Sequence, residues 1–365
     1  MKIADLATPC VLVEESTLRR NIARYQALCN QHGKLLWPMV KTHKSTQIAR
    51  MQQDAGASGF LCGTPDECEV LARAGISNIM YAYPVANQPA IHRVLALAKS
   101  CSFYARIDGA EAATTLNAHA LENGVRINYT IIIDSGLHRF GVAPEKARAL
   151  ADALRPLAGL SFCGISTHPG HVYAASSPAE LPRYVYEETH AISTALEALK
   201  VGGYTCKIIS SGATPTFTGA VSDVNINILH PGNYVFNDAI QVVLGVATEA
   251  DCALTVLGSV ISHPAEGVYI IDAGTKTLGL DKGAHGNTAI KSFGIIKNHP
   301  ACEMVSLSEE VGKIIAPPNY ESPLRVGDKL QIIPNHACVP ASLASCLILH
   351  NGEAVTERVK VDMRG

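Results

Sequence analysis

Short apolar runs and amphipathic helical segments alternate along roughly the first two thirds of the sequence. Continuous apolar runs of this length are typical of parallel strands buried on both faces. Eight of them predict strands, at residues 35–40, 59–62, 78–83, 101–107, 129–134, 160–167, 206–210 and 224–229. Helical patterns lie between most of these runs, and eight parallel strands are the number that closes a barrel. Residues 14–250 are therefore predicted to form a (β/α)8 barrel.

The pattern changes beyond about residue 250. Apolar runs joined by turns, without long helical segments, lie at residues 254–262, 267–271, 289–296, 329–333 and 345–349. Such a run of strands predicts an antiparallel β domain over residues 251–365, to which residues 1–13 are assigned. The predicted fold class is thus α/β, a barrel followed by a smaller antiparallel β domain. One residue conflicts with it, because Pro38 lies inside the first predicted strand.

Composition narrows the class of protein. Of 365 residues, 47% are hydrophobic and 17% charged, which is typical of a chain with a large core. The formal net charge of −2 argues against nucleic-acid or membrane-surface partners, and no apolar run reaches the ~18 residues of a membrane span. The first residues do not resemble a signal peptide, and 11 scattered cysteines indicate reduced thiols. We therefore expect a cytoplasmic protein.

Lys41 follows the first predicted strand, where an apolar run gives way to a polar turn. The exits of barrel strands open on the face where barrel enzymes act. A lysine held there can act as a nucleophile, because burial lowers the pKa of an amine. A solvated lysine pair in a loop would give the same local sequence, so both interpretations stay open at this point.

Two turns rich in small residues follow the seventh and eighth predicted strands, at residues 210–216 and 229–234. In barrels these two loops commonly form a phosphate site from backbone N–H groups. The loop after the fifth strand carries Arg139, and the loop after the sixth carries His168 and His171, either of which is a candidate general base. Each of these residues could equally have a purely structural role or lie exposed to solvent.

In the predicted β domain, His336 and Cys338 stand two residues apart after an apolar run. If the chain is extended here, both side chains point the same way and can share one metal ion. Two ligands alone leave positions for water or substrate, as in a catalytic metal site. A buried cysteine beside an unrelated histidine is the alternative.

Together these motifs give a family resemblance over nearly the whole chain. The sequence resembles the metal-activated pyridoxal phosphate enzymes that include eukaryotic-type D-serine dehydratase and D-threonine aldolase, on the alanine-racemase fold. The segments that carry the resemblance are residues 40–44, 134–139, 212–215, 231–236, 271–276 and 334–338.

The resemblance implies roles for individual residues. Lys41 is expected to bind pyridoxal phosphate covalently, and His336 and Cys338 are expected to bind a divalent ion. A thiolate ligand suits zinc better than manganese or magnesium. The full set of expected cofactor-binding residues is Lys41, Arg139, Tyr173, Gly212, Ala213, Thr214, Gly232, Asn233 and Tyr234. The family also implies a homodimer.

The implied activity is removal of water from a β-hydroxy D-amino acid, as in D-serine dehydratase, because His-x-Cys is typical of the family's dehydratases. Aldol cleavage of the D-threonine aldolase type, with His168 or His171 as base, is the alternative, followed by amino-acid racemisation and by cofactor carriage without catalysis. Two departures bear on the substrate. Trp37-Pro38-Met39 stands where the family often has Arg-Pro-His, and Val311 stands where it often has histidine.

Overall fold

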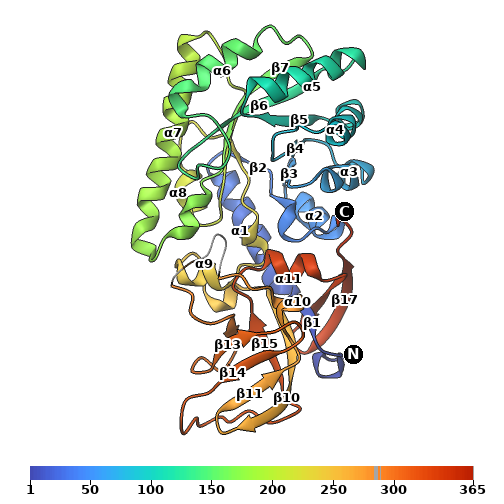
Figure 1. The fold of residues 1–365 in the computed structure, drawn as a ribbon, viewed down its shortest axis with the longest axis vertical. Coiled ribbons are helices and arrows are strands. Elements are labelled where there is room, and N and C mark those ends of the chain that lie inside the picture. The colour runs from blue at the N-terminus through green and yellow to red at the C-terminus, as the bar shows by residue number, and fades with distance from the viewer. Residues whose placement is uncertain (283–286, 288, 365) are drawn as a thin grey trace.

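The computed structural model describes residues 1–282, 287 and 289–364. Two units, a barrel and a β domain, lie one above the other (Figure 1). The chain begins in the β domain, then forms the barrel, and returns to the β domain. Within the described residues, no helix is both long and apolar enough to cross a membrane.

Eight parallel strands form the barrel, in the order β2-β9-β8-β7-β6-β5-β4-β3. Their bounds are β2 Leu35–Leu36, β3 Phe60–Cys62, β4 Ile79–Tyr81, β5 Phe103–Ile107, β6 Ile127–Ile133, β7 Leu160–Thr167, β8 Ile208–Ser211 and β9 Ile228–Leu229. The two end strands meet through a parallel bridge between Met39 and Leu61, so the barrel is almost closed. All eight predicted strands are present, and the predicted α/β fold class, a barrel followed by a smaller β domain, is confirmed.

Helices cover the outside of the barrel. They are α1 Glu15–Gln31, α2 Thr46–Asp54, α3 Pro65–Arg73, α4 Gln88–Ser100, α5 Ala110–Glu122, α6 Ala147–Leu154, α7 Leu181–Val201 and α8 Phe217–Ala220. The short helix α9 Ala239–Val243 lies at the junction with the β domain (Figure 1). Local sequence sets several of their starts. Thr64 accepts a hydrogen bond from the Glu67 N–H and is followed by Pro65, and Asn87 caps α4 in the same way.

The first strand is shorter than predicted, and the reason is Pro38. Pairing as a strand ends at Leu36, because proline has no N–H to donate to the next strand. The Pro38 carbonyl still accepts from the Leu61 N–H at 3.0 Å. The chain then turns into a short 3-10 segment, Val40–Thr42, which carries Lys41 at the mouth of the barrel.

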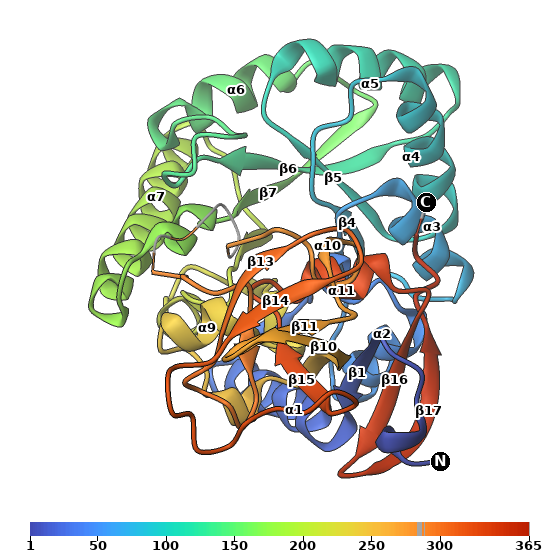
Figure 2. The same ribbon diagram turned by 60° about the horizontal axis from the view of Figure 1, so that its bottom comes forward.

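The β domain contains a mixed sheet, which corrects the prediction of a purely antiparallel one. The strand β1 (Cys10–Glu14) pairs antiparallel with β10 and parallel with β16. The other strands are β10 Leu254–Ala265, β11 Val268–Ile271, β12 Ile295–Ile296, β13 Glu303–Leu307, β14 Gly312–Ile315, β15 Lys329–Ile333, β16 Cys346–Asn351 and β17 Ala354–Lys360, with short helices α10 Thr275–Leu278 and α11 Cys338–Leu343. Figure 2 shows α11 on the side of this domain that faces the barrel.

A continuous apolar core joins the two units. One cluster of buried side chains includes barrel residues such as Ile131 and β-domain residues such as Leu349. Beneath the barrel mouth, Tyr25 of α1 packs against Phe217 and Tyr234, with ring centroids 4.4 Å apart in both pairs. This shared core fixes how the β domain faces the barrel mouth.

Candidate active site

A cavity of about 290 Å³ lies between the barrel mouth and the β domain. Its barrel wall is made of segments that follow strands β2, β6, β7, β8 and β9, so it lies at the carboxyl ends of the strands. Its opposite wall includes His336 and Cys338, at the start of α11. Barrel enzymes place their chemistry at this end.

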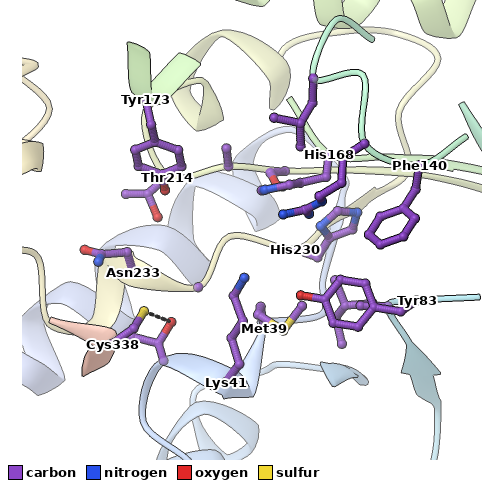
Figure 3. A pocket seen from close by; sticks show the side chains of 18 of the residues that line it. Met39, Lys41, Tyr83, Phe140, His168, Tyr173, Thr214, His230, Asn233 and Cys338 are labelled. Atoms are coloured by element: carbon purple, nitrogen blue, oxygen red, sulfur yellow. Dashed lines mark hydrogen bonds between the residues drawn. The ribbon is translucent and has the colours of Figure 1, made fainter. Parts of the chain in front are cut away.

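Lys41 extends into this cavity. Its amine points toward the centre in Figure 3, and within the described part of the chain no hydrogen bond or ion pair holds it. Behind it stands Gly63, where an added Cβ would lie 3.3 Å from the Lys41 Cβ. The neighbouring Lys44 is different, because its amine pairs with the buried Glu67 at 2.5 Å. The structure therefore separates the two lysines, leaving only Lys41 available to a ligand.

The two small-residue loops line the same cavity. Gly212, Ala213, Thr214, Gly232 and Asn233 all contribute to its wall. A Cβ at Gly212 would lie 2.8 Å from the backbone nitrogen of His230, and one at Gly232 would lie 2.8 Å from Thr42 Oγ1. Both glycines thus permit a close approach of backbone segments. The Tyr234 N–H donates to Thr214 Oγ1 at 3.1 Å and ties the two loops together.

Arg139 lines the cavity from the loop after β6. Its guanidinium lies 5.9 Å from the Tyr83 ring centroid and 5.2 Å from that of Phe140. Cation–π contacts hold it without neutralising its charge, and no carboxylate pairs with it among the residues described. Arg139 therefore offers a positive charge to whatever occupies the cavity.

His336 and Cys338 face each other, but for a different reason from the one predicted. The intervening Ala337 has helical torsion angles and Cys338 begins α11, so the segment is not extended. Burial by itself lowers the pKa of His336, yet the adjacent Cys338 and Asp238 raise it overall. Burial raises the pKa of Cys338, yet His336 and Lys41 lower it overall. The pair therefore favours a thiolate, the form that binds metals.

Two further contacts hold this pair. Cys338 Sγ and Thr42 Oγ1 form a hydrogen bond of 3.4 Å that links α11 to the barrel (Figure 3). His336 Nδ1 lies 3.3 Å from a carboxylate oxygen of Asp238. The described residues contain no group of three or more His, Cys, Asp or Glu side chains arranged for a metal. Two protein ligands and open positions suit a metal that also binds substrate.

The two candidate histidines lie in different places. His168 lines the cavity, and its Nδ1 lies 3.0 Å from the Gly212 carbonyl oxygen. Burial, with the nearby positive charge of Lys41, lowers the pKa of His168 to about 3, so the ring is neutral. His171 is not among the lining residues, because its Nε2 pairs with Glu187 at 2.9 Å and its ring packs on Tyr184. The geometry therefore favours His168 over His171 as a base.

The two predicted tyrosines also separate. Tyr173 lines the cavity. The Tyr234 side chain lies beneath it, fully buried, and its hydroxyl accepts from Gln52 Nε2 at 2.9 Å. Only the backbone of Tyr234 is near the small-residue loops, so its side chain is not placed to touch a ligand in the cavity.

Arg106 and His230 line the cavity and were not predicted. Arg106 is buried in β5 and donates through Nε to Ser166 at 2.7 Å. One of its terminal nitrogens, both ring nitrogens of His230 and Asn233 Oδ1 are buried without a partner in the described structure. The inward position of Arg106 on its strand was a usable signal. Nothing local in the sequence distinguishes His230 from a turn histidine.

These unpaired polar atoms show what the cavity is built to hold. A buried polar group without a partner costs about 1–3 kcal/mol, so several in one cavity indicate a polar ligand. Pyridoxal phosphate offers a phosphate, a ring nitrogen, a phenolic oxygen and an aldehyde. The glycine-lined loops, Asn233, His230, the two arginines and Lys41 fit these groups in kind and number.

The two departures from the family pattern also have positions. Met39 lines the cavity beside Lys41, so an apolar side chain stands where the family often has histidine. Trp37 points elsewhere, donating through Nε1 to Ser58 at 3.1 Å and packing near Tyr104. Val311 is not among the lining residues.

The barrel, its β domain and the lysine-centred cavity define an enzyme of the alanine-racemase type, the class that uses pyridoxal phosphate. Residues 13–239 match the family model "Alanine racemase, N-terminal domain", and residues 253–349 match "Putative serine dehydratase domain". The chain belongs to this family of pyridoxal-phosphate-dependent lyases, in the group that joins these two domains.

Its similarity to individual proteins extends over the whole length. It is 31% identical to D-threo-3-hydroxyaspartate dehydratase of Delftia sp. (strain HT23), over 92% of each chain. A Cys-to-Ala variant of D-threo-3-hydroxyaspartate dehydratase, solved in the metal-free form, superimposes with a TM-score of 0.91 at 29% identity, covering 100% of both chains. D-threonine aldolase from Filomicrobium marinum gives a TM-score of 0.91 at 25% identity, covering 100% of this chain and 98% of that one.

Proposed function

We propose that this enzyme removes water from a β-hydroxy D-amino acid, with pyridoxal phosphate and a divalent metal, and yields an oxo acid and ammonia. One observation carries the proposal: the free amine of Lys41 and the His336–Cys338 pair line a single cavity from opposite walls. An amine at a carbonyl cofactor and a metal at the β-hydroxyl are the two groups that this elimination needs.

The cofactor would be held by residues of the barrel. The loops with Gly212 and Gly232 would bind its phosphate through backbone N–H groups. Arg139 would lie near its phenolic oxygen, and Lys41 would bind it covalently. When bound, the cofactor supplies an electron sink for charge developing at the substrate Cα.

The remaining chemistry falls to side chains of the two walls. Lys41 Nζ would remove the proton from the substrate Cα. His336 and Cys338 would hold the metal, and a thiolate ligand with an imidazole favours zinc. A metal there would act as a Lewis acid on the β-hydroxyl. His168 would keep its neutral ring beside the reacting atoms.

Aldol cleavage to glycine and an aldehyde is the second candidate, and His168 is the observation that favours it. A neutral imidazole in the cavity can accept the β-hydroxyl proton, which that reaction requires. Cys338 weighs toward dehydration, since the resemblance associates a cysteine at this position with dehydratases.

A product assay separates the two reactions. The purified enzyme with pyridoxal phosphate and zinc is incubated with D-serine, D-threonine and D-threo-3-hydroxyaspartate in turn. We expect ammonia and an oxo acid, and loss of both after treatment with a chelator. Glycine and an aldehyde would instead establish aldol cleavage, and turnover indifferent to the chelator would contradict the metal's role.

We also propose a homodimer in a reducing, cytoplasmic environment. All 11 cysteines carry free thiols in the structure, which supports the reducing environment. Light scattering of the purified protein tests the homodimer. A measured mass equal to that of one chain would contradict it.

A further inference from the structure

Asp238 is a fully buried carboxylate at the junction between barrel and β domain. It stands immediately before α9 and outside the wall of the cavity. An aspartate at this position commonly serves only as a helix N-cap, and Oδ1 of Asp238 does accept from the Gln241 N–H at 3.2 Å. That role leaves Oδ2 unexplained.

Three groups converge on Oδ2 of Asp238. Asn233 Nδ2 donates to it at 2.5 Å, and the Ala337 N–H donates at 2.8 Å. His336 Nδ1 lies 3.3 Å away. Asn233 belongs to the loop expected to hold the cofactor's phosphate, and Ala337 stands between the two expected metal ligands. One oxygen therefore contacts both halves of the site.

The backbone around Asp238 makes this contact rigid. The Ala239 N–H donates to the Pro334 carbonyl at 3.0 Å, just before the metal pair in the sequence. On the other side, the Asn237 N–H donates to the Asn233 carbonyl at 2.8 Å. Asn237 itself has a φ of 50°, a left-handed conformation that asparagine tolerates and that turns the chain toward α9. A shift of either loop is thus transmitted to the other through Asp238.

We propose that Asp238 is a positioning residue that couples cofactor binding to metal binding. The inference rests on the proposed function, since it takes His336 and Cys338 as metal ligands. Ligating histidines ordinarily hydrogen-bond through their second ring nitrogen, and losing such a partner weakens metal binding 10- to 100-fold. His336 Nδ1 has no hydrogen bond among the described residues, and Asp238 Oδ2, 3.3 Å away, is placed to become its partner. The same oxygen accepts from Asn233, so ordering the Asn233 loop with cofactor orders the metal pair.

Coupling of this kind is reciprocal. If pyridoxal phosphate tightens metal binding by some factor, the metal must tighten pyridoxal phosphate binding by the same factor. We expect a factor in the usual range of about 5 to 150 for the wild type. A purely structural role for Asp238 would lower thermal stability and leave this factor unchanged.

The test compares metal affinity with and without cofactor. Zinc dissociation constants are measured by competition with a chromogenic chelator, for the full-length protein with pyridoxal phosphate bound and after its removal. Cobalt absorption reports the ligand geometry independently of turnover. In Asp238→Asn, which keeps an oxygen acceptor but loses the charge, we expect zinc to bind about 10- to 100-fold more weakly. We expect the ratio between the two cofactor states to fall toward one.

Asp251→Asn is the matched control. Asp251 accepts from the Thr248 N–H and hydroxyl in another short capping turn, away from the cavity. Zinc affinity should be unchanged in this variant. Equal zinc affinity in the wild type and Asp238→Asn, or an equal loss in both variants, would overturn the coupling while leaving the proposed function intact. No zinc binding by the wild type would overturn both.

Discussion

The two walls of the cavity are built in different ways. The barrel wall consists mostly of segments that each follow a strand, together with residues in the strands themselves such as Arg106, so most positions repeat a single rule of the fold. The opposite wall depends on the six-residue helix α11, whose start is held by Thr42 and Asp238 of the barrel. The barrel thus carries Lys41 and the proposed phosphate loops, whereas the proposed metal pair lies on a short helix held by contacts with the barrel.

Lys41→Ala is the strongest test of the barrel wall. Lys41 is the only lysine among the described residues that line the cavity. Removing its amine takes away both the covalent link and the base, so we expect turnover to fall by about 10³-fold or more. The visible absorbance of bound cofactor should shift to that of the free aldehyde. Lys276→Ala, which alters an exposed lysine paired with Glu310, should retain full activity. Undiminished turnover in Lys41→Ala would remove the basis of the proposed function.

Cys338→Ala tests the opposite wall and should leave the covalent link between Lys41 and the cofactor intact. With one of two protein ligands removed, we expect zinc affinity and activity to fall by about 100-fold, while the absorbance of bound cofactor stays that of the wild type. Cys346→Ala is a matched control, because its thiol lies on β16 outside the cavity wall. A change in the cofactor spectrum in Cys338→Ala would show that the two walls are not separable.

The same contrast explains what the sequence could predict. The barrel follows from continuous apolar runs alternating with helical patterns, and each predicted strand lies where a run was seen. Candidate residues after strands, such as Lys41, Gly212 and Gly232, were therefore brought together by the fold rule alone. Arg106 was missed, although its inward position on β5 was a signal that could have identified it.

Prediction was weaker in the β domain. Strands β13, β14 and β17 were not predicted. Most side chains of β13 and β17 are exposed, and β14 alternates buried and exposed positions, so none of the three gives a continuous apolar run. Of residues 289–296, only β12 (Ile295–Ile296) is strand. Cys338 was placed in an extended segment, although it starts a helix fixed by a carboxylate about 100 positions earlier. Such contacts depend on tertiary docking, which no local pattern records.

Glu188 makes the stability of the barrel side of the molecule depend on pH. This acid of α7 is fully buried and accepts from the hydroxyl of Ser211, the residue before Gly212. Burial raises the pKa of Glu188 to about 7, so the folded protein holds a proton that the unfolded chain releases above about pH 4.5. Its contribution to folding is therefore full below pH 4.5 and is lost as pH rises through 7.

Glu188→Gln mimics the protonated acid at every pH. Relative to the variant, the wild type should lose about 3 kcal/mol of unfolding free energy between pH 4.5 and 8, at about 1.4 kcal/mol per pKa unit. Urea unfolding at a series of pH values measures this difference. Glu197→Gln, an exposed site on the same helix, should follow the wild type. A constant difference across the range would show that Glu188 is not protonated in the folded state.

Thr42→Val is the smallest and most selective test, because it alters the contact between the walls without removing a ligand. Valine keeps the shape of threonine but loses the hydroxyl that forms a 3.4 Å hydrogen bond with Cys338 Sγ. A single hydrogen bond contributes about 1 kcal/mol, so zinc affinity should fall about fivefold. Thr42→Ser retains the hydroxyl and should bind zinc like the wild type. If both variants weaken zinc binding equally, packing of the threonine methyl, rather than its hydroxyl, positions Cys338.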